Sequence, residues 1–96
     1  MNIVIKGAGL VAVDGDMTFS GIDKKVSTAF EFLTQSKQIT VDLSGVMNAD
    51  SAGLALLIEW IKFARSKRVQ FKIKNVPNQI LNLAKLSGLE NTGYFQ

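Results

Sequence analysis

The sequence contains no cysteine and no histidine, and these two absences exclude several kinds of site. Metal sites built from cysteine and histidine cannot form within this chain, and neither can catalytic Ser-His or Cys-His pairs. A secreted domain of 96 residues often needs disulfide bonds for stability, so the lack of cysteine favours a cytoplasmic domain held together by its core. We therefore expect a cytoplasmic protein without a bound metal or cofactor.

Long apolar runs and strong clusters of one charge are also missing. The longest apolar run begins at Ala52 and is interrupted by Glu59 and Lys62, so it falls short of the roughly 20 residues of a membrane span. The beginning of the sequence lacks the pattern of a signal peptide. The net charge is +3, but the basic residues are mostly scattered, which does not favour binding to nucleic acid. We expect the protein to reach a membrane only through a partner or a surface contact.

The length and the 47% hydrophobic content predict a single globular domain over residues 1–96. Alternating apolar and polar residues predict strands, and apolar residues at helical spacing predict helices. The predicted strands cover residues 3–6, 10–13, 39–44 and 69–74, with Gly7 to Gly9 as the first turn and Asp14-Gly15 ending the second strand. The predicted helices run from Asp23 to Leu33, from about Ser51 to Ser66, and from Pro77 to Gly88, with Ile80, Leu81, Ala84 and Leu86 facing inward in the last.

This element order, β-β-α-β-α-β-α, predicts an α/β fold with a mixed sheet of about four strands and an initial hairpin. Residues 69–74 alternate between apolar and polar side chains, so one face of the sheet should be buried and the other exposed to water. Three or so helices are therefore expected, largely on one face.

The helix predicted after Ser51 carries two apolar stripes. Its core stripe contains Leu54, Leu57, Ile58, Ile61 and Ala64, which share one face at 100° per residue. A second stripe contains Leu56, Trp60 and Phe63, with the small residues Ala52 and Ala55 nearby. Either a neighbouring helix or the C-terminal Tyr94 and Phe95 covers this second stripe, or it is an exposed patch for a partner. In the second case Trp60 should be partly exposed.

The segment from Val41 to Leu57 is the most informative part of the sequence. A strand is expected to end near Ser44, a polar loop follows, and Asp50 or Ser51 should cap the next helix. Ligands of open α/β sheets bind beyond the carboxyl ends of the strands, where this loop is expected.

These residues resemble the STAS domains of anti-sigma-factor antagonists, which carry D-L-S-x-V followed by D-S-S-G-L. The matching segments here are Asp42-Leu43-Ser44-Gly45-Val46 and Asp50-Ser51-Ala52-Gly53-Leu54. The likeness continues through Leu57 and again from Leu83 to Leu89. Within the family, the chain is similar to the MlaB group, which has a comparable D-x-G-G-L-A-L-L run and a later A-K-L segment.

The resemblance implies a non-catalytic interaction module. Likeness to the MlaB group implies an accessory subunit that docks on the ATPase of an Mla-type phospholipid-transport ABC complex, peripheral to the inner membrane, and that helps to maintain outer-membrane lipid asymmetry. Likeness to the antagonists implies instead a switch in which an anti-sigma kinase phosphorylates Ser51. Two departures weaken the switch: Gly15-Asp16-Met17-Thr18 stands where many antagonists have G-E-L-D, and Ala52 stands where they have serine.

An enzyme that uses Asp42 and Asp50 is a third hypothesis, but the sequence has neither a phosphate-binding loop nor a clear acid pair. Three of the residues expected at the partner surface also have a purely structural explanation. Ser51 can cap the helix, Asp50 can interact with the helix dipole, and Gly53 can allow close packing. The expected partner surface contains Asn48, Asp50, Ser51, Ala52, Gly53, Ala55, Leu56, Trp60 and Phe63.

Overall fold

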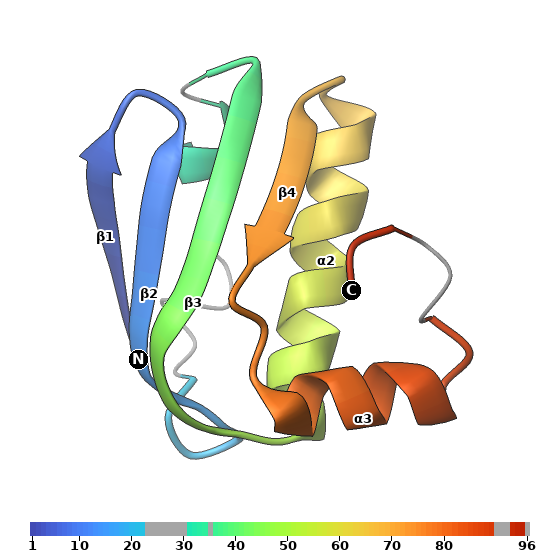
Figure 1. Cartoon of the computed structure of the whole chain (residues 1–96). Helices are drawn as coiled ribbons and strands as arrows, with labels where there is room; N and C mark the ends of the chain where they lie inside the picture. Colours follow the sequence, from blue (N-terminus) through green and yellow to red (C-terminus); the bar gives the residue numbers. More distant parts are fainter. Residues whose placement is uncertain (23–30, 35, 90–92, 96) are drawn as a thin grey trace.

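A computed structural model of the protein describes residues 1–22, 31–34, 36–89 and 93–95 (Figure 1). The helix expected from Asp23 falls mainly on residues 23–30, which lie outside the described residues, and residues 31–34 form a short 3-10 helix. In chain order the described elements are β1 (Asn2–Gly7), β2 (Leu10–Met17), η1 (Glu31–Thr34), β3 (Gln38–Ala49), α2 (Ser51–Ser66), β4 (Gln70–Lys74) and α3 (Asn78–Leu86).

The four described strands form one mixed sheet in the order β1-β2-β3-β4. β1 and β2 are an antiparallel hairpin, whereas β2–β3 and β3–β4 are parallel pairs. Gly9 has a φ of +77° in the hairpin turn, a conformation that glycine adopts without strain. The α/β fold with a mixed four-stranded sheet is therefore confirmed, and the described residues contain two α-helices rather than three.

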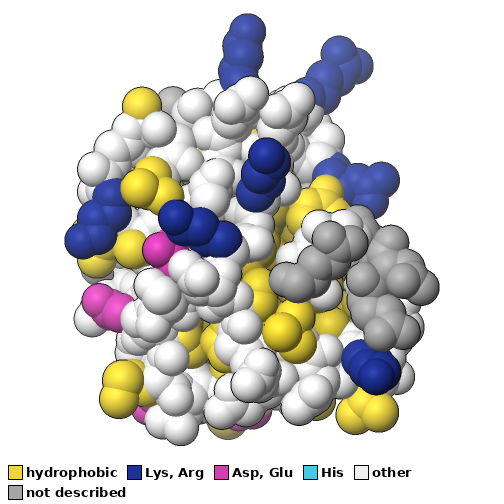
Figure 2. All heavy atoms as spheres, in the orientation of Figure 1, with side chains coloured by type: hydrophobic (Ala, Val, Ile, Leu, Met, Phe, Trp, Pro, Cys, Tyr) yellow, Lys and Arg dark blue, Asp and Glu magenta, His cyan; other side chains and the backbone are white. Residues whose placement is uncertain are grey.

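The core lies between the sheet and α2 (Figure 1). Alternate residues of the strands are buried on the side of α2. Leu54, Leu57, Ile61 and Ala64 of α2 are buried against them as predicted, whereas Ile58 of the same predicted stripe is half-buried. A fully buried side chain of this size stabilises the fold by roughly 1.5–3 kcal/mol. The sheet residues of the core are Val11, Val13, Met17, Ile39, Val41, Leu43 and Phe71. The opposite face carries exposed Lys72 and Lys74, and Figure 2 shows lysine and arginine side chains scattered over it.

β2 and β3 are longer than predicted. β2 continues past Asp14-Gly15 to Met17, and β3 continues past Ser44 to Ala49. β2 and β3 stay paired along this length through two shifts in register, one between Ala12 and Asp14 and one between Gly15 and Asp16. Gly15 has a φ of +85°. Gly45 is also required, because a Cβ there would lie only 2.8 Å from Cβ of Asp14. The segment predicted as a polar loop is therefore strand, and only Asp50 separates β3 from α2.

α3 begins after Pro77 and lies across the first turns of α2 (Figure 1). Ile80 and Ala84 are buried as predicted, but Leu86 is 85% exposed, so its predicted inward position is wrong. Leu86 follows Ile80 by six positions, which places it roughly 240° around the helix and off the packed face. Gly88, with a φ of +73°, ends the helix in the expected way. No helix formed by the described residues combines the length and the apolar character needed to cross a bilayer.

Candidate functional site

Asp50 fastens the end of β3, the start of α2 and the loop after β2 to one another. Its Oδ1 accepts a hydrogen bond from the backbone N–H of Ala52 at 2.9 Å, so Asp50 is the N-cap of α2. Its Oδ2 accepts a second hydrogen bond, from the backbone N–H of Phe19 at 3.1 Å. Its own N–H donates to the carbonyl oxygen of Met17 at 3.2 Å. Asp50 therefore positions the loop of residues 18–22 against the helix.

Ser51 is the first residue of α2 and is exposed. Because Asp50 provides the cap, Ser51 is not needed as one, and its hydroxyl has no hydrogen-bond partner among the described residues. A small polar group at a helix N-terminus is thus presented to solvent.

Gly53 is buried, so the packing explanation is the right one for this residue. A Cβ at this position would collide with the carbonyl oxygen of Met17 and lie 3.0 Å from Cβ of the same residue. It would also lie 3.4 Å from Cδ1 of Ile80. The absence of a side chain lets α2 approach β2 and α3 closely, and Gly53 is not part of the exposed surface.

The second apolar stripe of α2 is not an exposed patch. Trp60 is 0% exposed, and its ring meets that of Phe32 edge-on at 5.1 Å between centroids. Leu56 is also buried, and Phe63 is half-buried with Nζ of Lys67 5.8 Å from its ring centroid. The prediction of a partly exposed Trp60 is wrong, because η1 supplies an aromatic cover. The C-terminal residues Tyr94 and Phe95 lie elsewhere, beside Ile58, Ile61 and Leu89.

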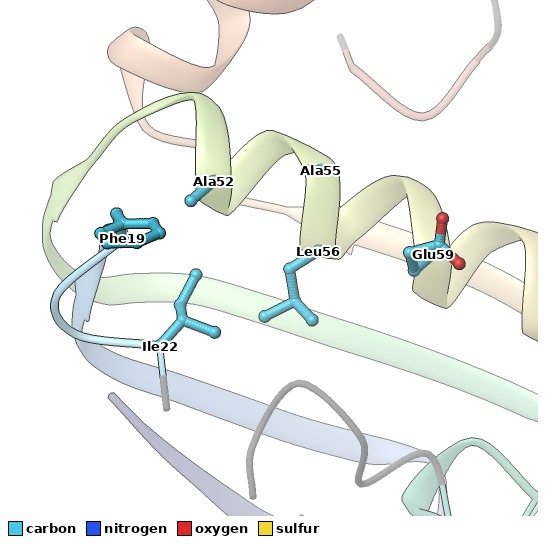
Figure 3. A pocket seen from close by; sticks show the side chains of 6 residues that line it. All are labelled: Phe19, Ile22, Ala52, Ala55, Leu56 and Glu59. Carbon is cyan, nitrogen blue, oxygen red and sulfur yellow. The ribbon is translucent and has the colours of Figure 1, made fainter. Parts of the chain in front are cut away.

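An apolar groove of about 370 Å³ lies between α2 and the loop after β2 (Figure 3). Phe19 and Ile22 come from the loop, and the facing side chains of Ala52 and Leu56 come from α2. Phe19 is 84% exposed, which is unusual for a phenylalanine. The groove is completed by Ala55 and by Glu59, one turn further along the helix. We call these six residues the α2 groove.

The α2 groove contains Ala52, Ala55 and Leu56 from the predicted surface, and it adds Phe19, Ile22 and Glu59, which sequence reasoning missed. The hydrogen bond between Asp50 and Phe19 joins two segments 31 positions apart, and no periodicity in the sequence indicates that pairing. The one available signal was an apolar phenylalanine inside the polar turn of residues 18–21. Asn48 lies nearby at the end of β3, where its Nδ2 donates to Oδ1 of Asp16 at 2.9 Å.

Asp42 belongs to a different part of the structure. It alternates with buried Val41 and Leu43, so its side chain lies on the sheet face away from α2. Its Oδ1 accepts hydrogen bonds from Nδ2 of Asn75 and from the N–H of Ser44, both at 2.9 Å, and these bonds hold the pKa of Asp42 below its usual value. Asp42 and Asp50 are each engaged separately and do not form the acid pair of the enzyme hypothesis.

Substitutions of Asp50 should separate its two structural roles. Asp50→Asn keeps an oxygen that can cap α2, but the amide NH₂ cannot accept from Phe19, so we expect a stability loss below about 1 kcal/mol. Asp50→Ala removes both bonds and should cost about 1–2 kcal/mol in urea unfolding. In both variants the Phe19 amide should exchange its hydrogen faster. Slow exchange in Asp50→Asn would contradict the positioning role, and Asp42→Asn serves as a control that leaves this amide unchanged.

Comparisons with known proteins agree with this geometry. The model of a protein family described as "Mlab, STAS domain" matches residues 3–95. No curated protein was found to match the sequence. Among solved structures, the anti-sigma factor antagonist SpoIIAA in its unphosphorylated form is similar, with a TM-score of 0.57 and 14% sequence identity. The match covers 88% of this chain and 78% of that one, and at this identity it shows a shared fold.

Proposed function

Because this chain belongs to the MlaB-type STAS domain family, we propose that it is a non-catalytic module that binds the ATPase subunit of an Mla-type phospholipid-transport ABC complex. STAS domains bind protein partners, and the proposal assigns that binding to the α2 groove and to Ser51 beside it. The protein would then be a cytoplasmic accessory subunit, held at the inner membrane by its partner and contributing to outer-membrane lipid asymmetry.

One observation carries this proposal: an open apolar groove with an exposed phenylalanine at its rim lies beside an exposed hydroxyl at the start of α2. Exposed apolar patches are uncommon on soluble domains unless they are used for binding, and aromatic residues are frequent anchors of protein interfaces. The fixed position of the loop of residues 18–22, fastened by Asp50, supports a preformed binding surface.

The proposal also holds that the protein has no catalytic activity of its own. The sequence has no phosphate-binding loop, and the carboxylates of Asp42 and Asp50 accept hydrogen bonds in separate parts of the structure. ATP hydrolysis would therefore belong to the partner.

The experiment is a calorimetric titration of this protein with the Mla-type ATPase subunit of the same organism. Ser51→Glu should weaken binding about tenfold or more, since it places a longer side chain where the partner packs against a small hydroxyl. It should change stability by less than about 1 kcal/mol, because the helix dipole tolerates an acid at this position. Ser51→Gln has nearly the same size without the charge, so a similar loss of binding in both variants would assign the effect to size. Unchanged binding by Ser51→Glu, with a large loss of stability, would mean that Ser51 is structural.

An anti-sigma-factor antagonist switched by phosphorylation of Ser51 is the second candidate. Two observations favour it: the fold shared with SpoIIAA and the exposed, unpaired hydroxyl of Ser51 among the described residues. Intact-mass analysis of the protein purified from its own host distinguishes the candidates. A phosphate on Ser51, together with binding to an anti-sigma kinase and not to the ATPase, would favour the switch.

A further inference from the structure

Three acidic side chains lie on the α2 groove or beside the loop that forms it, although the whole chain has a net charge of +3. Glu59 lines the groove, Asp50 anchors its loop, and Asp16 abuts the same loop, since a Cβ added at Gly21 would lie 2.9 Å from Cβ of Asp16. Residues 7–22 and 38–61, which supply all groove residues, contain no lysine or arginine, and the next basic residues in the sequence after Ile22 are Lys24 and Lys25.

Two cationic groups lie near these acids in the described structure. Nζ of Lys62 is 3.6 Å from Oε1 of Glu59, and the amino group of Met1 donates to the carbonyl oxygen of Gly21 at 3.2 Å. Both side chains of the Lys62–Glu59 pair are well exposed, at 69% and 59%. An exposed ion pair of this kind contributes little to the free energy of folding. Glu59 can therefore leave Lys62 and pair with a cation of a partner with little loss of stability.

The shape of the groove suits one large apolar side chain. Ala52 and Ala55 are small and let the backbone of a partner come close, Leu56 forms the floor, and Phe19 stands at the rim. Glu59 lies at the end of the groove away from Phe19, one turn beyond Leu56 (Figure 3).

Resting on the proposed docking function, we propose that the α2 groove binds a basic amphipathic segment of the partner protein. The segment packs one large apolar side chain against Ile22 and Leu56 and places a lysine or arginine against Glu59. Two other occupants fit the charges less well. A second copy of this chain docked groove to groove would bring its own acids against Asp16, Asp50 and Glu59, and an anionic lipid surface would be repelled by the same groups.

The test uses two synthetic amphipathic helical peptides with identical leucine positions, one carrying lysines and the other glutamates. Each is titrated into the isotope-labelled protein, and the backbone amide shifts of Ala52, Ala55 and Glu59 are followed by NMR. The lysine peptide should shift these amides and bind at least tenfold more tightly, with an affinity that falls as salt is added. General attraction to a chain of charge +3 would favour the glutamate peptide instead, so this preference must arise locally.

Glu59→Gln should reduce the preference about tenfold, whereas the matched control Lys62→Gln, one turn away on the same helix, should retain or increase it. Equal affinities, a preference for the glutamate peptide, or shifts outside the groove would overturn the inference. Groove shifts on adding anionic phosphatidylglycerol vesicles or on concentrating the protein alone, without lysine selectivity, would assign the groove to a membrane or to a second copy.

The same variants separate this inference from the function on which it rests. If the ATPase binds the wild type and Glu59→Gln equally well and without salt dependence, the proposal of docking on the ATPase is supported and the proposal of a basic partner segment is wrong. If the ATPase does not bind but the groove selects the lysine peptide, the proposal of a partner with a basic segment is supported and the ATPase is the wrong partner.

Discussion

Trp60→Ala is expected to lower the free energy of unfolding by about 3–5 kcal/mol, the range typical of truncating a fully buried tryptophan. The indole is 0% exposed, and its edge-on contact with Phe32 joins α2 to η1. Removing it leaves a cavity and also removes the contact with Phe32, through which η1 covers the second stripe of α2. The measurement is urea unfolding followed by circular dichroism, because the substitution removes the only tryptophan.

Two variants make this prediction specific. Trp60→Phe should cost far less, about 1–2 kcal/mol, because Nε1 of Trp60 has no hydrogen-bond partner among the described residues and its loss breaks no bond. Phe63→Ala, from the same stripe but half-buried, should also cost less than Trp60→Ala. A wild-type tryptophan emission that is red-shifted and readily quenched would contradict the buried position of Trp60.

Gly53→Ala is expected to destabilise the domain by about 2 kcal/mol or more, although alanine is the better helix former by about 1 kcal/mol. The new methyl group would collide with the backbone carbonyl of Met17, and a backbone atom cannot move aside as a flexible side chain can. α2 must then shift from β2, which also displaces Asp50 from Phe19. Urea unfolding measures the stability, and the chemical shift of the Phe19 amide reports the displacement.

Ala55→Gly is the matched control, because residue 55 is exposed in the same helix. It should cost about 1 kcal/mol from helix propensity alone. Gly53→Ala and Ala55→Gly are opposite substitutions, yet both should destabilise the domain. Helix propensity alone cannot explain this result. A more stable Gly53→Ala protein would show that the close approach of α2 to β2 is not required.

Local patterns were sufficient to predict most of the secondary structure. The alternation in residues 39–44 and 69–74 correctly predicted strands with one buried face, and the helical spacing from Leu54 to Ala64 correctly predicted the core side of α2. These predictions succeed because each element buries one face against the same core, so its periodicity is visible within a few residues.

Contacts between distant segments could not be predicted in this way. Asp14-Gly15 has the composition of a turn, yet both residues belong to β2, where shifts in register allow them to pair with β3. Trp60 has the angular position of a surface residue, yet it is buried, and Phe32 packs edge-on against its ring. The wall of the α2 groove formed by Phe19 likewise depends on a hydrogen bond to a residue 31 positions away. In each case the deciding neighbour is remote in sequence, and a pattern within one element contains no information about it.

The single residue between β3 and α2 has a mechanical consequence. A twelve-residue strand runs into a sixteen-residue helix through Asp50, whose backbone N–H and both carboxylate oxygens are engaged. A junction of one residue with these hydrogen bonds cannot act as a hinge. A partner that binds there would therefore meet a preformed surface. Little conformational entropy is then lost on association. Control of this protein would come from blocking access to the surface or changing its charge, and not from bending the domain into a second shape.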